Sequence, residues 1–378
     1  MNHASFAFPE QLAGLDAFDA IIDVRSPAEY AEDHLPGAIN CPVLDDAQRS
    51  EVGTLYTQVS PFAARKIGAA MVAENIARHL RQSFLEQPKN WRPLIYCWRG
   101  GQRSGSLTLV MRQIGWNARQ LEGGYKSYRR FVVGRLAEVP QGLTYQVVCG
   151  ATGSAKSRVL RAIAGCGGQV LDLEDLARHK GSVLGALPNA EQPSQKAFES
   201  MLLQTLLAFD PARPVFVEAE SRKIGGVQIP DALIATMRAS PCLAIEAGFA
   251  ARVDFLRRDY AYFADDVDWL VERLETLRSL RGNEAVNRWI ELARTPHAAT
   301  LIADLLENHY DPLYCRSQAG NYAGHRAPRV FRTDDLSEHG IERLAQDIMR
   351  DIEPTAAIGA VRPSQRVSAQ FATDAAAS

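Results

Sequence analysis

A glycine-rich turn between an apolar strand and a helix is the feature that most restricts the fold of this chain. Residues 150–157 read Gly-Ala-Thr-Gly-Ser-Ala-Lys-Ser, after an apolar segment at 146–149 and before a helical pattern from about Lys156. Backbone N–H groups of such a turn surround phosphate oxygens, the lysine neutralises their charge, and the last hydroxyl can bind Mg²⁺. The pattern predicts a strand, a phosphate-binding loop and a helix, the start of an α/β domain.

The predicted diphosphate-binding residues of this P-loop are Gly150, Thr152, Gly153, Ser154, Lys156 and Ser157. Ser157 is also the candidate Mg²⁺ ligand, and the identity of any bound metal stays open. Ala155 stands where the motif GxxxxGK[ST] has its second glycine, so the loop geometry is open and nucleoside triphosphate hydrolysis does not follow. Carboxylates at the ends of later strands are candidate cleft residues, with helix capping as the alternative: Asp172, Glu174, Glu218 and Glu220.

Short apolar runs alternate with helical patterns along both halves of the chain. Strands are predicted at 20–24, 94–97, 146–149, 170–173, 215–217 and 243–245, and a helix at 104–114. Such alternation predicts parallel sheets covered by helices. The region after 250 is helical and charged, and the Ala- and Ser-rich end at 353–378 predicts disorder.

Composition excludes several classes of protein. The formal net charge of −2 argues against a protein that coats nucleic acid non-specifically, although local basic patches remain compatible with RNA. None of the six cysteines forms a CxxC pair, which excludes zinc ribbons and thioredoxin-type dithiols. We see no signal peptide and no apolar run of the roughly 20 residues that span a bilayer, so we expect a reduced cytoplasmic protein with no membrane partner.

A cysteine loop, 96–104, reads Tyr-Cys-Trp-Arg-Gly-Gly-Gln-Arg-Ser and joins a buried strand to a helix. Amides at a helix N-terminus and a nearby arginine stabilise a thiolate and hold an anion beside the sulfur. Cys97 and Arg103 are therefore the predicted catalytic residues. The predicted anion-binding residues of the same loop are Arg99, Gly100, Gly101 and Ser104.

This loop resembles the active site of the rhodanese family. Two further segments carry the resemblance: 23–30 with 34–40 (DVRSPAEY, HLPGAIN), and the Gly-Gly turn at 121–125 (LEGGY). The resemblance implies a cysteine that carries sulfur as a persulfide. Asp33 departs from the family, which commonly has glycine there. Five residues lie between Cys97 and Arg103, one more than in common sulfurtransferases and the same as in cysteine-dependent phosphatases, which points to a larger, phosphate-like or selenium-bearing anion.

A rhodanese domain followed by a P-loop domain is similar to the bacterial tRNA 2-selenouridine synthases, from about residue 15 to 340. Segments 53–56, 61–69, 173–182 and 310–314 also carry this likeness. The family resemblance implies action on wobble 2-thiouridine in tRNAs for lysine, glutamate and glutamine. It implies geranylation of the sulfur by geranyl diphosphate, then replacement of the geranylthio group by selenium from selenophosphate. No tightly bound cofactor is implied, and Mg²⁺ is a candidate.

The likeness suggests a division of labour between the loops. We expect Lys156 and Ser157 to hold the diphosphate of geranyl diphosphate. Cys97 would take up selenium as a selenosulfide, with Arg99 and Arg103 on the anion; alternatively, the pocket only positions selenophosphate. A selenophosphate-producing enzyme is a candidate partner. The residues considered for tRNA contact are Arg65, Lys66, Tyr125, Lys126, Tyr128, Arg129, Arg130, Arg252, Arg257, Arg258, Trp289 and Tyr310.

The expected domains are a rhodanese-like unit at 1–135, a linker at 136–144, a P-loop α/β unit at 145–250, its helical extension at 251–352, and the tail. Three other functions fit parts of this pattern. A sulfurtransferase with an accessory nucleotide-binding domain is disfavoured by the longer loop. A cysteine-dependent phosphatase is favoured by that loop, but no general acid is identifiable. A non-catalytic scaffold would not need Cys97.

Overall fold

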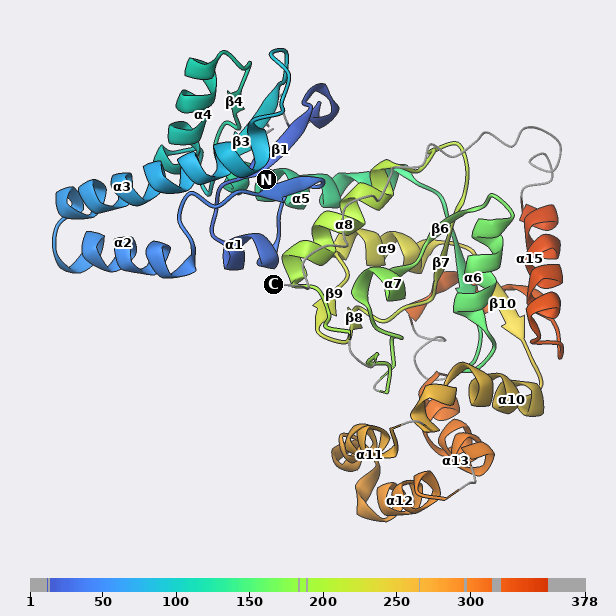
Figure 1. Cartoon of the computed structure of the whole chain (residues 1–378). Helices are drawn as coiled ribbons and strands as arrows, with labels where there is room; N and C mark the ends of the chain where they lie inside the picture. Colours follow the sequence, from blue (N-terminus) through green and yellow to red (C-terminus); the bar gives the residue numbers. More distant parts are fainter. Residues whose placement is uncertain are drawn as a thin grey trace, which may run out of the picture.

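The computed structural model describes residues 12, 14–182, 184–187, 190–264, 266–295, 298–314 and 321–352. These residues form two α/β units, each built on a parallel sheet, and a group of helices beside the second unit (Figure 1). The predicted α/β class with two parallel sheets is confirmed. The segment predicted to be disordered, 353–378, lies outside the described residues.

The N-terminal sheet has the strand order β2-β1-β3-β4, and all neighbouring strands are parallel. Its strands are β1 (Ala20–Asp23), β2 (Ala38–Asn40), β3 (Pro93–Tyr96) and β4 (Arg119–Gln120), and its helices are α1 (Pro27–Glu32), α2 (Asp46–Gln58), α3 (Pro61–His79), α4 (Gln102–Ile114) and α5 (Gly124–Glu138). Residues of α3 and α4 pack on one face of the sheet and residues of α5 on the other. Because the strands are parallel, the segments that follow β1 and β3 meet at one edge of the sheet.

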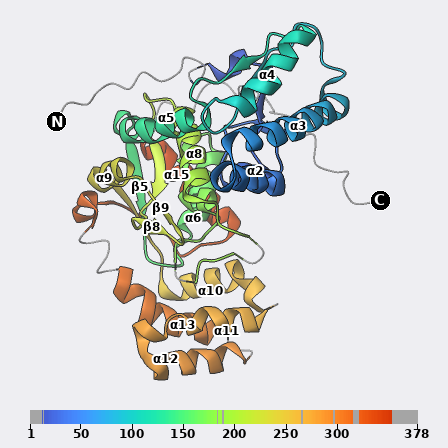
Figure 2. The ribbon, with the colours of Figure 1, turned by 90° about the vertical axis from the view of Figure 1, so that its left-hand side faces the viewer.

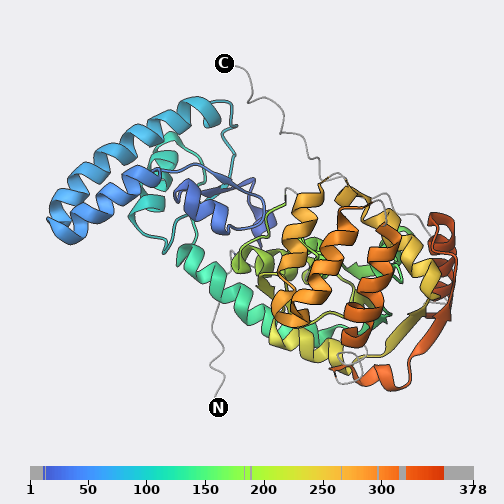
Figure 3. The ribbon, with the colours of Figure 1, turned by 90° about the horizontal axis from the view of Figure 1, so that it is seen from below.

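Helices α2 and α3 form a long antiparallel hairpin that extends away from the rest of the molecule (Figures 1 and 3). Asp45 and Ser60 cap the N-termini of the two helices by accepting backbone N–H bonds, and Pro61 occupies the first turn of α3. The tip exposes Tyr56 and Phe62. The sequence analysis did not identify this hairpin as a separate feature.

The second sheet has the order β11-β10-β5-β7-β6, again all parallel. Its strands are β5 (Tyr145–Cys149), β6 (Gln169–Leu171), β7 (Val215–Glu218), β10 (Cys242–Glu246) and β11 (Arg329–Arg332). The helices of this unit are α6 (Lys156–Gly165), α7 (Leu173–Ala177), α8 (Gln195–Leu207), α9 (Asp231–Ala239) and α15 (Glu338–Ile352), and β8 (Lys223–Ile224) and β9 (Val227–Gln228) form a small antiparallel pair. Helices α6 and α15 pack on one face, and α8 and α9 on the other.

The region expected to be a helical extension contains a strand. Helices α10 (Phe249–Asp259), α11 (Val267–Glu275), α12 (Arg278–Ala293) and α13 (Ala298–Leu305) form the group below the sheet unit in Figure 2. The chain then returns, and β11 pairs with β10 at the sheet edge. The short segment 329–332 has only two apolar residues, so its sequence carried no clear strand pattern.

The segment expected to be a linker, 136–144, is mostly helical. Helix α5 continues to Glu138 and is followed by a 3-10 helix, Val139–Gly142. Leu136 and Leu143 are buried in one hydrophobic cluster that contains residues of both sheets. Figure 3 shows α5, in teal, running from the N-terminal unit along the second unit. The two units are therefore joined by a shared core and a continuous helix.

A buried carboxylate adds a polar contact at this junction. Asp33 is only 2% exposed, and its Oδ2 accepts hydrogen bonds from the hydroxyls of Tyr125 at 2.8 Å and Ser200 at 3.1 Å. The guanidinium of Arg129 lies 3.5 Å from the same oxygen and also binds Glu199 of α8. The departure at Asp33 from the family's usual glycine thus ties the N-terminal unit to α5 and α8.

Replacing Asp33 with alanine should destabilise the protein strongly, because Arg129 and two buried hydroxyls lose a shared acceptor. We expect the free energy of unfolding in urea to fall by about 3 kcal/mol. The matched control is Glu32→Ala, which removes only a half-exposed ion pair with Lys196 and should change that free energy by less than about 1 kcal/mol. Equal effects of the two substitutions would show that Asp33 does not hold the units together.

Candidate active sites

Cys97 lies directly after β3, in the turn that begins α4, and is 4% exposed. Its Sγ accepts a hydrogen bond from the backbone N–H of Gly101 at 3.3 Å and from the hydroxyl of Ser104 at 3.1 Å. Donors that face a sulfur at a helix N-terminus stabilise its thiolate form. The structure therefore brings Cys97, Gly101 and Ser104 together as the sequence predicted.

Glycines allow the loop to fold tightly around the sulfur. Gly100 has φ of +65°, and a Cβ there would lie 2.8 Å from the carbonyl oxygen of Leu121. Gly124, in the predicted Gly-Gly turn, would place a Cβ 2.3 Å from the carbonyl oxygen of Cys97. The backbone N–H of Tyr125 donates to that carbonyl at 2.9 Å. The first turn of α5 thus closes the cysteine loop.

Arg103 does not point freely into the loop, because Glu29 of α1 holds it. Two nitrogens of the Arg103 guanidinium bind the two carboxylate oxygens of Glu29, at 2.6 and 3.2 Å. Burial raises the pKa of Glu29, but the hydrogen bonds and charge of Arg103 outweigh it, so that pKa lies below its ordinary value. The sequence analysis missed Glu29, although it lies in the rhodanese-like segment. The other predicted arginine, Arg99, is exposed.

Gln120 is a second residue that the sequence analysis missed. Its side-chain Nε2 donates to the carbonyl oxygens of Gly100 at 2.7 Å and Gly101 at 3.0 Å, and it lies 2.8 Å from the hydroxyl of Ser104. Gln120 ends β4, the strand beside β3, so the sheet itself positions this amide. The residue therefore fixes which way the peptide groups of the loop face.

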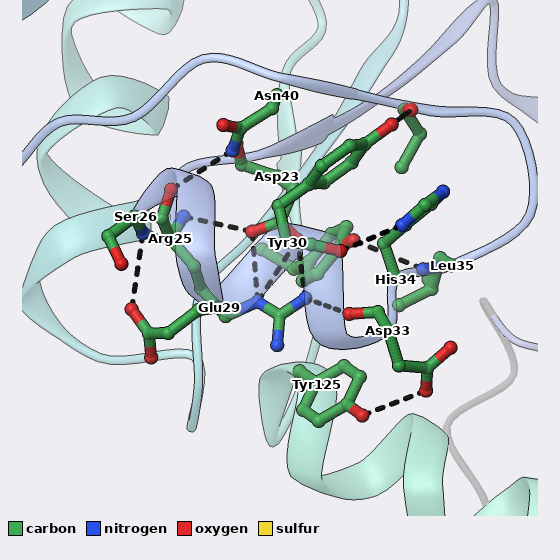
Figure 4. Close-up of polar contacts among 12 residues, drawn as sticks. Asp23, Arg25, Ser26, Glu29, Tyr30, Asp33, His34, Leu35, Asn40 and Tyr125 are labelled. Carbon is green, nitrogen blue, oxygen red and sulfur yellow. Dashed lines mark hydrogen bonds and ion pairs between the residues drawn. The ribbon is translucent and has the colours of Figure 1, made fainter. Parts of the chain in front are cut away.

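The Asp-Val-Arg segment at 23–25 serves as scaffold beneath the loop. Arg25 is fully buried, forms bidentate contacts with Asp23 and donates to the carbonyl oxygen of Asp33 at 2.6 Å (Figure 4). Its guanidinium lies 3.9 Å from the centre of the Tyr125 ring. Figure 4 also shows Asp33 bound by Tyr125. The contacts of Arg25 connect the cysteine loop to the junction between the two units.

The P-loop has the left-handed backbone conformation that its motif requires. Ala155 adopts φ 60° and ψ 24° immediately before α6, a conformation that costs a residue with a Cβ about 1–2 kcal/mol. Gly150 and Gly153 also have positive φ, and a Cβ on Gly150 would lie 2.5 Å from the Ser154 hydroxyl oxygen. The substitution of the motif's second glycine by Ala155 therefore leaves the loop geometry glycine-like.

Three glutamates lie beside this loop. Carboxylate oxygens of Glu174, Glu218 and Glu220 all lie within 4.8 Å of one another. Ser157 Oγ is 2.8 Å from Glu174 Oε2 and 2.9 Å from Glu218 Oε2, and Lys156 Nζ is 3.3 Å from Glu218 Oε1. One hydroxyl proton cannot serve both carboxylates, so a second proton or a cation is required between them.

The electrostatics of the cluster agree with that requirement. Burial and the charge of Glu218 raise the pKa of Glu174 to about 8, and burial with the charges of the other two raises the pKa of Glu220 well above its ordinary value. Oxygen ligands of this kind, together with the Ser157 hydroxyl, fit Mg²⁺. Asp172 lies outside the cluster; it caps α7 by accepting from the backbone N–H of Asp175 at 2.9 Å.

A cavity of about 1110 Å³ extends from the P-loop into the helical group. Its polar end contains Lys156, Ser157 and the three glutamates. An apolar wall is formed by Leu256, beside Gly153 of the P-loop, and by Leu184, Phe263, Leu270, Leu301 and Ile302 in or against the helical group. Charged side chains, among them Lys180, Asp259 and Arg294, line the cavity as well. From the sequence, the helical region was a candidate for tRNA contact, and this apolar wall was not predicted.

Several residues considered for tRNA contact are occupied within the fold. Tyr125, Tyr128 and Trp289 are buried, so their rings cannot stack on a base in this structure. Arg129 and Arg252 are held by the carboxylates Glu199 and Asp311. The exposed members of that set are Arg65, Lys66, Lys126, Arg130, Arg257 and Arg258. Among the described residues, no helix is both long and apolar enough to cross a membrane.

Comparisons with known proteins match both halves of the chain. A family model described as tRNA 2-selenouridine synthase AAA domain matches residues 143–272, and one described as Rhodanese-like domain matches residues 9–130. The chain is 36% identical to a tRNA 2-selenouridine synthase of Cupriavidus necator, over 86% of this chain and 95% of that protein. It is 32% identical to one of Alcanivorax borkumensis, over 78% of this chain and 88% of that protein. A third, of Nitrosomonas europaea, is 37% identical over 64% of this chain and 63% of that protein.

The raised pKa of Glu174 predicts how stability depends on pH in the absence of metal. The ordinary pKa is 4.5 and the folded value about 8, so between these pH values the folded state keeps a proton that the unfolded state has lost. The free energy of unfolding should therefore fall as the pH rises from 5 to 8. Glu174→Gln removes the titrating carboxyl group, so its free energy of unfolding should fall less between pH 5 and 8. Urea titrations at several pH values, in the presence of a chelator, measure this free energy.

The control is Glu122→Gln, which changes an exposed carboxylate and should keep the pH dependence of the unmodified protein. If Glu174→Gln lost stability with pH as steeply as the unmodified chain, Glu174 would have to be ionised throughout that range.

Proposed function

This chain belongs to the tRNA 2-selenouridine synthase family, and we propose that it converts wobble 2-thiouridine to 2-selenouridine in two steps. In the first, geranyl diphosphate alkylates the sulfur. In the second, selenium from selenophosphate replaces the geranylthio group. The proposed substrates are the tRNAs for lysine, glutamate and glutamine, in the cytoplasm, with a selenophosphate-producing enzyme as a partner.

The cavity beside the P-loop is the observation that carries this proposal. Geranyl diphosphate has a strongly anionic end and a ten-carbon apolar end. The cavity offers groups for both, because it is lined by the P-loop and by apolar side chains, most of them from the helical group. A nucleotide, with its polar sugar and base, would leave much of this apolar wall without a matching group. The shape and chemistry of the cavity therefore favour a prenyl diphosphate over a nucleotide.

In the alkylation step, the thiouridine sulfur attacks the first carbon of the geranyl group, the carbon–oxygen bond to diphosphate breaks, and the base loses its N3 proton. Lys156 and the loop amides stabilise the negative charge that develops on the departing diphosphate. Mg²⁺, held by Ser157 and the glutamates Glu174, Glu218 and Glu220, would supply further charge neutralisation. The apolar wall keeps water away from the geranyl carbon.

The selenium step is assigned to the cysteine loop. This loop surrounds Cys97 with donors and carries Arg103, so it can bind a second phosphate-bearing substrate separately from the P-loop. The N-terminal unit, which carries the cysteine loop, also has exposed basic side chains that are available for tRNA phosphates, including Arg65, Lys66, Lys126 and Arg130.

Separate substitutions should divide the reaction into its two steps. The protein is incubated with a tRNA carrying wobble 2-thiouridine, geranyl diphosphate and selenophosphate, and the nucleosides are analysed by mass spectrometry. Cys97→Ala should accumulate the geranylated nucleoside. Lys156→Ala should slow geranylation about a hundredfold or more, because the leaving charge loses its partner. Lys223→Ala, at an exposed lysine, is the control. Unmodified thiouridine in every mixture with the unmodified protein would refute the proposed function.

The apolar wall should contribute to the affinity for the geranyl chain alone. Ile302→Ala removes three methyl or methylene groups from a half-buried position on the cavity wall. We expect geranyl diphosphate to bind about tenfold more weakly and inorganic diphosphate to bind unchanged. Titration calorimetry with both ligands measures this. If both ligands bound equally more weakly, Ile302 would act on the P-loop, and the geranyl chain would not lie along α13.

A further inference from the structure

We propose that Cys97 attacks the phosphorus atom of selenophosphate, forms a transient phosphocysteine and releases hydrogen selenide anion, rather than taking selenium onto its own sulfur. The inference rests on the proposed function, since it takes selenophosphate as the substrate of this loop. It replaces the selenosulfide expected from the sequence with a step of the kind used by cysteine-dependent phosphatases.

Electron counting separates these two routes. Selenium is at the selenide level both in selenophosphate and in 2-selenouridine. A selenosulfide on Cys97 would oxidise the selenium and thiol by two electrons, and the electron acceptor would have to be the phosphorus itself, which would leave as phosphite. Attack on phosphorus needs none: the sulfur–phosphorus bond forms, the phosphorus–selenium bond breaks, and its electron pair leaves with selenium. Water then attacks phosphorus, phosphate departs, and the thiolate is regenerated.

The freed selenide completes the balance. It attacks C2 of the geranylated base, the carbon–selenium bond forms, and the geranylthiolate leaves with the electrons of the carbon–sulfur bond. The proton of the hydrogen selenide anion passes to N3, which lost its own in the alkylation step. Monoprotonated selenophosphate brings the proton of the hydrogen selenide anion with it. Because hydrogen selenide is a stronger acid than a thiol, this anion leaves phosphorus without a further proton donor. This explains how the loop can work although no general acid was identifiable in the sequence.

The loop is built to hold a phosphoryl group over the sulfur. Gln120 binds the carbonyl oxygens of Gly100 and Gly101, and in a trans peptide the N–H points opposite to the carbonyl. The following N–H groups, of Gly101 and Gln102, are therefore turned to the other side, where that of Gly101 already donates to Cys97 Sγ. Among the described residues, the N–H of Gln102 has no acceptor, as expected in the first turn of a helix.

Arg103 supplies the charge that such a group requires. Glu29 accepts hydrogen bonds from two nitrogens of the Arg103 guanidinium, so other N–H groups of Arg103 remain for phosphoryl oxygens. The bidentate pairing also fixes the plane of the guanidinium. Ser104, bonded to Cys97 Sγ at 3.1 Å, can donate to the thiolate when it leaves phosphorus. Five residues between Cys97 and Arg103 enclose a tetrahedral anion, whereas a single selenium atom needs no such cradle.

Two labels on selenophosphate test the inference. The full-length protein is mixed with selenophosphate labelled either at phosphorus or at selenium, then denatured within the first turnover, and the label on the protein is counted. Phosphorus should appear on the unmodified protein and on Cys166→Ala, which removes an exposed thiol, but not on Cys97→Ala. Arg103→Lys should form the adduct about a hundredfold more slowly, because a point charge replaces the planar donor.

Selenium retained on Cys97, or no phosphorus adduct from protein that makes 2-selenouridine, would overturn the inference. The tRNA assay on the same preparation keeps the two claims apart. If 2-selenouridine forms while selenium remains on Cys97, only the phosphorus attack is wrong. If the phosphorus adduct forms and tRNA is never modified, the attack stands and the proposed function fails.

Discussion

The first turn of α5 is the contact on which both halves of the structure depend. Its Gly-Gly start packs against the backbone of Cys97, closely enough that a Cβ on Gly124 would overlap the carbonyl oxygen. The same helix then buries Val132 and Leu136 in the cluster shared with the P-loop unit. The loop that holds the thiol and the interface that joins the units are thus made by one rigid element, and a shift of one unit would strain the other.

The charge balance at the P-loop constrains what it can bind. One lysine faces three glutamates whose oxygens lie within 4.8 Å of each other. Like charges this close in a buried site cannot all remain ionised without a cation, and the raised pKa of Glu174 expresses that. A diphosphate adds more negative charge to the same place. Protons or Mg²⁺ must therefore accompany the anion, so the glutamates and the P-loop act as one site.

Sequence patterns predicted the parts of the sites that lie within a few residues of each other. The cysteine loop and the P-loop are each contiguous, so strand, turn and helix signals placed them correctly between β3 and α4 and between β5 and α6. The pairing of Glu29 with Arg103 and the contacts of Asp33 join residues far apart in the chain, and no local pattern reports them. Tyr125, Tyr128 and Trp289 were considered for base stacking, but aromatic residues also fill cores, and here all three are buried. Pro140 and Gly142 were expected to break regular structure at 136–144, but both lie in the 3-10 helix that follows α5.

The two loops differ in what surrounds the phosphate, and that difference explains why one chain would carry both. In the proposed reaction the phosphate at the P-loop is a leaving group, and the site offers Lys156 for its charge and an apolar wall for the carbon skeleton left behind. At the cysteine loop the sulfur of Cys97 lies beside the N–H of Gly101 and the hydroxyl of Ser104, so in the proposed step the phosphorus itself is attacked. The first arrangement releases a carbon electrophile, and the second releases a selenium nucleophile. Substitution at C2 of the base needs both the geranyl group, which turns the sulfur into a leaving group, and the selenide that replaces it. Because α5 joins the two loops, one protein supplies both.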